Sequence, residues 1–183
     1  MQYSKTIALK DGRQCRLRNG VEREGAVVLE VFLCSHEQTD YLRTYPDEGG
    51  MTDEDEGRYL QEKTESADEI EIVAEIDGQI VGSAGIERVG AFEKVRHRAE
   101  FGVSVLRAYW GLGIGRALTE ACIACAKEAG YAQLELDVVA ENERAVALYQ
   151  SLGFVEFGRN PRGFRSRFSG WQELVLMRLE LDE

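Results

Sequence analysis

Two neighbouring segments with alternating apolar residues give the clearest pattern in the chain. From Glu69 to Asp77 apolar side chains occupy every second position, and the alternation returns from Ile80 to Ile86. Such alternation predicts strands with one buried face. The residues between them, Asp77-Gly78, favour a two-residue hairpin turn. We therefore expect an antiparallel β-hairpin over these residues.

The second half of the chain changes between strand and helix periodicity. Residues 100–106 alternate as a strand, and residues 114–130 carry apolar side chains three and four positions apart, which predicts an amphipathic helix ending at Gly130. Residues 134–138 predict the next strand. Asn142 then suits the start of a short helix that Gly153 closes. This order predicts a strand–helix–strand unit followed by a second helix.

The remaining parts of the chain give weaker patterns. Four segments are assigned from composition and short alternation: a strand over 14–18, a short strand over 154–157, a loop over 160–170 and a final strand over 171–181. Residues 26–34 fit a strand by their β-branched side chains or a helix by their apolar pairs, and the charged residues before them favour the helix. After a loop over 41–51, Thr52 suits the start of another helix, because acidic residues fill its first turn.

Together these segments make about seven strands and about four helices, with hairpins first and strand–helix–strand units later. Such an order predicts an α/β (α+β) fold in which helices flank one mixed sheet. A length of 183 residues suits one domain with a well-buried core, so we expect a single domain over residues 1–183.

Charge and composition exclude several classes of protein. The formal net charge is −11, whereas a basic patch is the expected footprint of nucleic-acid binding. No apolar run approaches the roughly 18 residues of a membrane span, and the first residues lack the apolar core of a signal peptide. We therefore expect a cytoplasmic protein with no nucleic-acid or membrane partner. Cys122 and Cys125 lie within a predicted helix without a second ligand pair, which favours reduced structural thiols over a metal site.

A glycine-rich turn, Trp110-Gly111-Leu112-Gly113-Ile114-Gly115, joins a predicted strand to a predicted helix. Bare backbone N–H groups at a helix N-terminus form a seat for phosphate. A P-loop is excluded because Arg116-Ala117 stand where Lys-Ser/Thr is required. A dinucleotide fingerprint is disfavoured because this turn follows a hairpin in mid-chain. The third mechanism is a pyrophosphate held by backbone amides without a metal, as in coenzyme A binding.

A second block of residues narrows this interpretation. It comprises Leu136-Asp137-Val138, Asn142, Ala145 and the run from Leu148 to Phe154. With the glycine turn at this separation, the segment from Glu100 to Phe157 resembles the GNAT superfamily of acetyl-CoA-dependent N-acetyltransferases. The family's glycine pattern is met, except that Trp110 stands in place of an Arg or Gln. The resemblance covers nearly the whole chain and implies a GNAT-like mixed sheet, with acetyl-CoA as cosubstrate and no metal.

The resemblance also implies which residues meet the cofactor. The backbone around Val103 and Val105 would pair with the pantetheine arm like an added strand. The pyrophosphate would be bound by amides of the turn, namely those of Trp110, Gly111, Gly113, Ile114, Gly115 and Arg116. Arg116 or Arg107 would supply the charge that Trp110 lacks. Asn142 would reach the cofactor, although capping of its helix already explains an Asn there.

Acetyl transfer to an amine needs a group that protonates the leaving thiolate and a group that takes a proton from the amine. Tyr149 matches the family's thiolate acid, since a phenol with a pKa near 10 is protonated at neutral pH; the alternative is a core aromatic. Glu100, on the strand face opposite Phe101, is the candidate general base; the alternative is an ordinary Glu paired with Arg98. Tyr149 and Glu100 are therefore the predicted catalytic groups.

The acceptor is less well specified. By resemblance, the first two helices and the last hairpin wall its site. Candidates to bind a cationic amine are Asp47 and Glu48, and candidates to bind an acceptor carboxylate are Arg162, Arg165 and Arg167; solvated side chains are the alternative in both sets. We expect direct transfer in a ternary complex to a primary amine of a small molecule or amino acid. The alternatives are acetylation of a protein or peptide N-terminus and a non-catalytic acyl-CoA-binding regulatory module. The sequence is also compatible with a homodimer.

Overall fold

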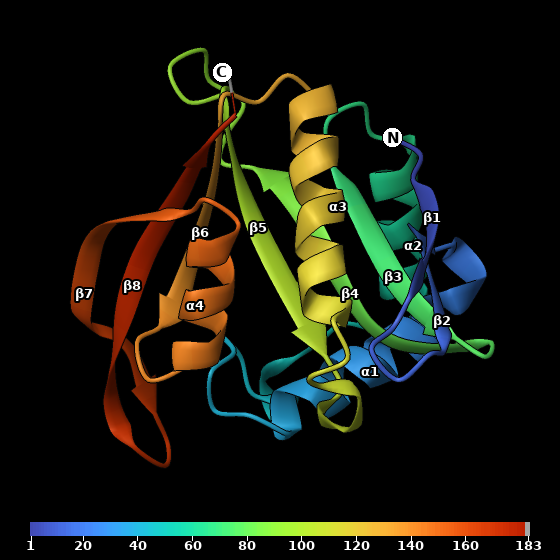
Figure 1. Cartoon of the computed structure of the whole chain (residues 1–183), viewed down its shortest axis with the longest axis horizontal. Coiled ribbons are helices and arrows are strands. Elements are labelled where there is room, and N and C mark those ends of the chain that lie inside the picture. The colour runs from blue at the N-terminus through green and yellow to red at the C-terminus, as the bar shows by residue number, and fades with distance from the viewer. Residues whose placement is uncertain (182–183) are drawn as a thin grey trace.

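Eight strands form one sheet in the order β1-β2-β3-β4-β5-β6-β8-β7 (Figure 1). The computed structural model describes residues 1–181. Its strands are β1 Ser4–Ala8, β2 Gln14–Asn19, β3 Ile70–Ile76, β4 Gln79–Arg88, β5 Arg98–Val105, β6 Gln133–Val139, β7 Val155–Ser166 and β8 Gly170–Glu180. Its helices are α1 Gly25–Glu37, α2 Asp53–Glu65, α3 Ile114–Glu128 and α4 Glu143–Ser151, with short 3-10 turns η1 Glu22–Glu24, η2 Pro46–Glu48 and η3 Arg107–Tyr109. The predicted mixed α/β fold is confirmed, with eight strands rather than about seven.

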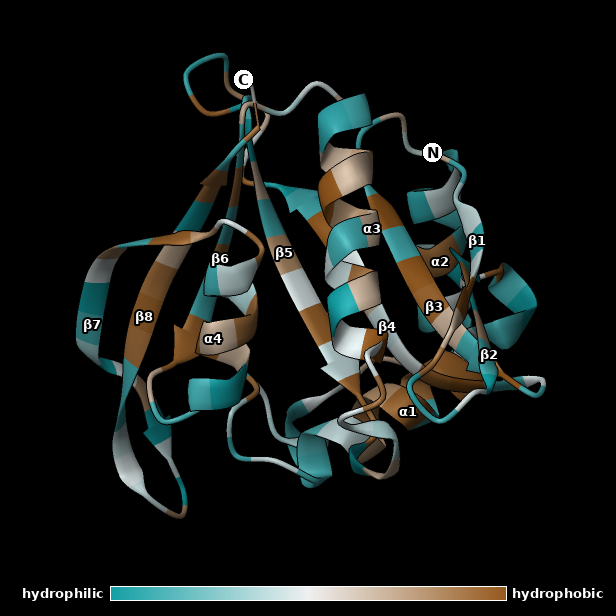
Figure 2. Cartoon of the chain, in the orientation of Figure 1, coloured by the Kyte–Doolittle hydropathy of each residue, from teal (hydrophilic) through white to brown (hydrophobic). Residues whose placement is uncertain are grey.

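The helices cover the sheet in two layers. In Figure 1, α3 and α4 lie in front of the sheet, and α1 and α2 lie behind it. Behind the sheet, Val28 and Val31 of α1 pack with Leu60 of α2 and Val73 of β3. In front, α3 buries Leu118 in a larger cluster with the central strands. Figure 2 shows the hydrophobic colour concentrated on the central strands and on α1, and each helix layer packs on the sheet through its own hydrophobic cluster. No helix within residues 1–181 is both long and apolar enough to cross a membrane.

Three local predictions are confirmed. Asp77 and Gly78 join β3 to β4 with φ angles of 51° and 81°, the left-handed pair that a type I′ hairpin requires. Residues 26–34 lie within α1, so the helical alternative is correct. Thr52 caps α2, because its hydroxyl accepts a hydrogen bond from the Asp55 N–H at 3.2 Å.

The two edge strands of the sheet, β1 and β7, are not predicted correctly from the sequence patterns. β1 has four of its five residues exposed, so it lacks the alternation that marks a half-buried strand. The loop predicted over 160–170 is wrong, because β7 continues to Ser166 and only a short turn separates it from β8. Pro161 and Gly163 favour turns, but an edge strand tolerates them at an irregularity, and the register of β7 shifts between Asn160 and Phe164.

The pairing between β5 and β6 is short. These two strands run parallel and pair at residues 98–100 with residues 133–135. β5 continues to Val105 and β6 to Val139, and Figure 1 shows the two strands diverging. Beyond the pairing, the backbone N–H and C=O groups on this edge of β5 form no hydrogen bonds with β6. Such groups need other hydrogen-bond partners. We call this opening in the sheet the β5–β6 wedge.

The α1–α2 layer depends on close backbone contact at Gly57. A Cβ on Gly57 would lie 2.5 Å from the carbonyl oxygen of Glu22, and a backbone atom cannot move aside cheaply. We predict that Gly57→Ala lowers the free energy of unfolding by about 1 kcal/mol, because overpacking costs about 1–3 kcal/mol and outweighs the gain of about 1 kcal/mol in helix propensity. Urea unfolding measures the difference.

Gly115→Ala in α3 is the matched control for this substitution. The nearest atom to a Cβ on Gly115 is a Leu148 methyl carbon at 3.9 Å, which is an ordinary contact. This variant should not lower the free energy of unfolding. Equal losses in the two variants would contradict the role given to the Gly57 contact.

Candidate active site

The glycine turn lies at the open end of the β5–β6 wedge, between η3 and α3. Gly111 and Gly113 have φ angles of 86° and 100°, which residues with a Cβ rarely adopt. Gly113 is the N-cap residue of α3, and no side chain caps this helix. A Cβ on Gly113 would meet nothing within 4 Å. The first N–H groups of α3, those of Ile114 and Gly115, thus have no capping side chain and favour an anion.

Trp110 occupies the last hydrogen-bonding group on the edge of β5 that faces the wedge. The Leu106 N–H donates to the Val81 carbonyl of β4 at 2.9 Å. Alternate residues of a strand direct their backbone groups to opposite edges, so those of Val103 and Val105 face the wedge. The Trp110 indole N–H donates to the Val105 carbonyl at 2.6 Å. The Val103 backbone is thus open to pairing, whereas the Val105 carbonyl already has a partner.

The backbone N–H of Trp110 is also engaged within the chain, since it donates to the Arg107 carbonyl at 3.1 Å. The amides of the turn that remain for an anion are therefore those nearer to the helix. The Arg107 guanidinium lies over the Trp110 ring, 5.4 Å from its centroid. This stacking holds a positive charge beside Trp110, the residue that stands in place of an Arg or Gln in the glycine pattern.

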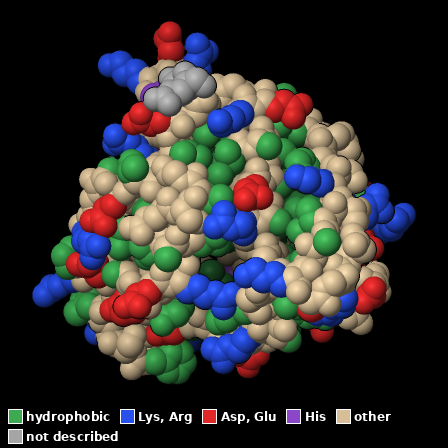
Figure 3. Space-filling view, viewed as in Figure 1, with side chains coloured by type: hydrophobic (Ala, Val, Ile, Leu, Met, Phe, Trp, Pro, Cys, Tyr) green, Lys and Arg blue, Asp and Glu red, His purple; other side chains and the backbone are tan. Residues whose placement is uncertain are grey.

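Two further arginines surround the turn. Arg116 donates to the Ser151 hydroxyl at 2.5 Å and lies 3.5 Å from a Glu120 carboxylate oxygen, so it ties α3 to α4. The Nη2 atom of Arg144 lies 3.7 Å from the point where a Gly111 Cβ would stand. Figure 3 shows basic side chains gathered around a hollow in this face of the molecule. Sequence reasoning missed Arg144, although its place two residues after the helix cap Asn142 puts it in the first turn of α4.

Tyr149 lies at the closed end of the wedge. It is buried in α4 and packs against Phe101, the first residue of β5 beyond the pairing, with ring centroids 6.1 Å apart. The hydroxyl forms no hydrogen bond with another residue of the described chain. Burial raises the pKa of Tyr149 to about 12, so the phenol keeps its proton. The helix that carries it begins at Asn142, whose side chain accepts from the Ala145 N–H at 3.4 Å; the capping role of Asn142 is therefore confirmed.

Glu100 lies on the opposite face of β5 and is exposed. Its cross-strand neighbours are Glu87 and Glu135. Arg98, the partner that an ordinary ion pair would require, instead holds Glu135, with Nη2 2.7 Å from Oε2. This hydrogen-bonded guanidinium lowers the pKa of Glu135. Within residues 1–181, Glu100 forms no ion pair and is left as a solvated carboxylate at the closed end of the wedge.

Two of the residues predicted to bind the acceptor, Asp47 and Arg167, bind each other. Arg167, in the β7–β8 turn, pairs with Asp47 at 2.7 Å and lies over the Tyr45 ring, 4.2 Å from its centroid. Asp40 accepts hydrogen bonds from two serine hydroxyls of the same turn, Ser166 at 2.6 Å and Ser169 at 3.1 Å. These contacts join the α1–α2 segment to the last hairpin. Arg162 and Arg165 are placed elsewhere, over the Trp171 ring.

A cleft of about 730 Å³ lies beside this bridge. The end of α1, the segment after it, Arg107, Glu141 and the β7–β8 turn line it. A cavity of this size suits a small organic molecule. The cleft includes His36, which sequence reasoning missed, because the helix pattern around it gave no sign of a cavity.

An α/β sheet that opens beside an uncapped glycine turn presents backbone amides that favour an anion. The model of the acetyltransferase (GNAT) family matches residues 33–154, and the chain belongs to that family. The predicted family membership is therefore confirmed.

The relatives differ in what their names say they act on. The chain is 32% identical over 112 residues to the L-amino acid N-acyltransferase MnaT of Escherichia coli K12, a match that covers 61% of this chain and 64% of MnaT. It is 37% identical over 81 residues to the ribosomal protein bS18 alanine N-acetyltransferase of the same organism, covering 44% of this chain and 54% of that protein. The chain thus spans less than two thirds of these relatives' lengths.

Solved structures share the fold over most of the chain. A GNAT-family acetyltransferase from Streptococcus pneumoniae aligns with a TM-score of 0.85 and 27% identity, covering 91% of this chain and 99% of that one. YncA from Salmonella typhimurium, solved with its cofactor acetyl-CoA, aligns with a TM-score of 0.81 and 22% identity, covering 92% and 95%. Both likenesses support the arrangement of the sheet around the wedge.

Proposed function

We propose that this chain is an acetyl-CoA-dependent N-acetyltransferase that acts on a primary amine of an amino acid or other small molecule. The observation that carries the proposal is the free edge of β5 leading to an uncapped helix N-terminus. An extended chain with amide groups can pair with the Val103 backbone, and a pyrophosphate attached to it then reaches the N–H groups of Ile114 and Gly115. Coenzyme A combines these two features, and as a thioester it supplies an activated acetyl group.

The charges around the turn support the same ligand. Arg107, Arg116 and Arg144 gather beside the glycine turn of a chain whose net charge is −11. A local cluster of this sign opposes the overall charge and favours a polyanion. We assign the pyrophosphate to the amides at Gly113 to Arg116 and a further phosphate contact to Arg144.

The catalytic proposal follows the sequence analysis for Tyr149. A buried phenol that keeps its proton can donate to a thiolate as the carbon–sulfur bond breaks. Its contact with Phe101 puts it beside the first residue of β5 that has no partner on β6. Glu100 remains a candidate base on the opposite face of the same strand.

The size of the cleft and the names of two relatives support an α-amine acceptor. The bridge between Asp47 and Arg167 closes one side of the cleft and limits it to a small-molecule volume. MnaT is named for L-amino acids and the second relative for an alanine amine. An α-amine has a pKa of about 8 and loses its proton more readily than a lysine side chain. A free amino acid is thus the acceptor we propose.

Release of free thiol from acetyl-CoA tests the proposal. The acceptors are L-alanine, L-methionine, spermidine and a peptide that begins with alanine. We expect turnover with at least one amino acid. Turnover with the peptide alone would identify a peptide N-terminal acetyltransferase, and acetyl-CoA binding without turnover would identify a non-catalytic acyl-CoA-binding module.

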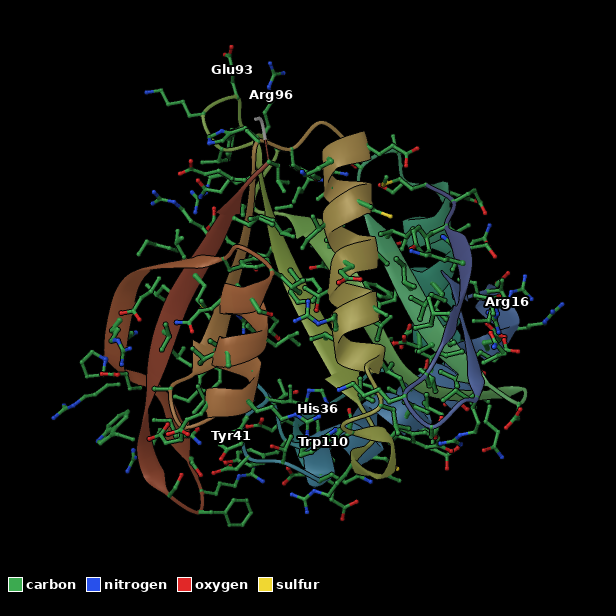
Figure 4. All side chains as sticks on the ribbon, viewed as in Figure 1. Arg16, His36, Tyr41, Glu93, Arg96 and Trp110 are labelled. Carbon is green, nitrogen blue, oxygen red and sulfur yellow. The ribbon has the colours of Figure 1, made fainter. Side chains whose placement is uncertain are left out.

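Arg144→Gln is predicted to weaken acetyl-CoA binding about tenfold. A hydrogen bond to a charged group is worth about 1.5–3 kcal/mol, and about 1.4 kcal/mol corresponds to a factor of ten. Isothermal titration calorimetry measures the dissociation constant, and the loss should shrink as salt screens the contact. Arg96→Gln is the matched control, since Figure 4 places Arg96 in a loop far from the glycine turn.

A second control separates phosphate binding from packing. S-acetylpantetheine lacks the pyrophosphate, so the Arg144 substitution should not change its affinity. An equal loss for both thioesters would show that Arg144 acts on the fold of the turn and not on a phosphate.

A further inference from the structure

The His36 imidazole is held in one orientation with one nitrogen left free. His36 lies in the last turn of α1 and is 7% exposed. Its Nδ1 donates to the Phe32 carbonyl at 2.8 Å, and the Phe32 ring lies against the imidazole with centroids 3.9 Å apart. Because a carbonyl only accepts, the neutral ring must carry its proton on Nδ1 and its lone pair on Nε2. Within the described chain, no residue forms a hydrogen bond with Nε2.

The position of His36 relates it to the β5–β6 wedge. The cleft that it lines is bordered by Arg107, which follows β5, and by Glu141, which lies just after β6, so the cleft spans the mouth of the wedge. The Arg107 N–H donates to the Gln38 side chain at 2.6 Å and fixes the end of α1 against the end of β5. Figure 4 labels His36 and Trp110 at the same end of the molecule, below the gap between α3 and α4 in this view. An acceptor in the cleft therefore meets His36 on its way to the free edge of β5.

His36 is the neutral base among the side chains that line the cleft. The charged residues of the lining come from four segments of the chain and are Glu37, Asp40, Asp47, Arg107, Glu141 and Arg167. Tyr41 and Tyr45 add two phenols. Asp40 and Asp47 are already bonded to the β7–β8 turn. Burial lowers the pKa of His36 against the raising effect of its bond to the Phe32 carbonyl, so the imidazole is neutral at pH 7. Glu100 does not line this cleft.

We propose that His36 is the base that takes a proton from the acceptor amine, an inference that rests on the proposed acetyl transfer. The ammonium group of the acceptor gives a proton to His36 Nε2. The neutral nitrogen attacks the acetyl carbon, and a carbon–nitrogen bond forms as the carbon–sulfur bond breaks. Tyr149 protonates the leaving thiolate and regains a proton from the attacking nitrogen, while His36 releases its proton to water in the cleft. The products are an amide, a free thiol and one proton.

His36→Asn tests the proposal, because the asparagine amide can still donate toward the Phe32 carbonyl but is not a base. With the best acceptor of the panel above, we expect kcat at pH 7 to fall about 10²-fold, which is the usual contribution of a general base. The KM for acetyl-CoA should not change. The deficit should shrink toward about pH 10, where an α-amine with a pKa of about 8 has already lost its proton.

Two variants accompany this measurement. His97→Asn is the matched control, since His97 is the second histidine of the chain and is exposed outside the cleft; it should behave as wild type. Glu100→Gln compares the sequence-based candidate directly. A kcat of His36→Asn within about threefold of wild type, or a deficit that is the same at every pH, would overturn the proposal, because a purely structural histidine gives one of these results. If the wild type acetylates none of the amines, the proposed function fails and the role of His36 fails with it.

Discussion

Tyr149→Phe is expected to lower kcat at least 10–10²-fold while the affinity for acetyl-CoA stays the same. The substitution removes the hydroxyl that we propose as the proton donor for the leaving thiolate, and general acids contribute rate factors of about this size or larger. It keeps the ring that packs between Phe101 and Phe154, so the wedge should keep its shape. Pre-steady-state mixing with measurement of free thiol separates the chemical step from product release.

The pH dependence adds a second expectation for Tyr149. Burial raises the pKa of this phenol to about 12, and the protonated form is the active one. Loss of its proton should therefore not reduce the rate of wild type below about pH 12. A decline at lower pH has to come from another group.

Tyr131→Phe is the matched control for the loss of one hydroxyl. Tyr131 is 5% exposed, and burial likewise raises its pKa to about 12. It lies in the connection between α3 and β6, outside the wedge. This variant should retain wild-type turnover. An unchanged kcat in Tyr149→Phe, with chemistry shown to limit the rate, would refute the assignment of the thiolate acid.

Gly113→Glu is expected to weaken acetyl-CoA binding by about 10²-fold or more. The new side chain would start from the N-cap of α3 and place a carboxylate in the open space in front of the first N–H groups. That carboxylate competes for the proposed seat of the pyrophosphate and repels the phosphate groups, at a helix end that favours one anion. Calorimetric titration with acetyl-CoA measures the loss.

Gly130→Glu controls for backbone strain at the other end of the same helix. Gly113 and Gly130 have φ angles of 100° and 81°, and a Cβ at either position would meet nothing within 4 Å. Both variants should therefore lose similar amounts of stability in thermal unfolding. Only Gly113→Glu should lose affinity, and a comparable loss in Gly130→Glu would mean that strain and not the anion seat is responsible.

The parts of the fold that local patterns predict correctly are those with one buried face. The β3–β4 hairpin and α3 each show their periodicity because alternate or every third and fourth side chains enter the core. β1 and the second half of β7 lie at the edges of the sheet, where exposed residues, a proline and a glycine carry no such pattern. Edge strands are defined by their neighbours, so their assignment needs the whole sheet.

The residues of the candidate site also divide into those that a local pattern predicts and those that depend on the whole fold. The glycine turn and the positions of Asn142 and Tyr149 are features of short segments, and sequence reasoning located them. Arg144 and His36 acquire their meaning only when α4 approaches the turn and α1 meets the end of β5. The engagement of the Trp110 indole with the Val105 carbonyl likewise depends on how η3 folds back. Contacts of this kind have no periodicity in the sequence.

The short ladder between β5 and β6 has a thermodynamic consequence. On one side of it stand the five strands β1 to β5, and on the other stand β6, β8 and β7, so the sheet is two parts that share few direct backbone bonds. A ligand that occupies the wedge would contact both parts and act as a link between them. Its binding energy then adds to the cohesion of the protein, by about 2.7 kcal/mol at a ligand concentration 100 times the dissociation constant. In the cell, the level of such a ligand would thus influence how long the folded chain survives.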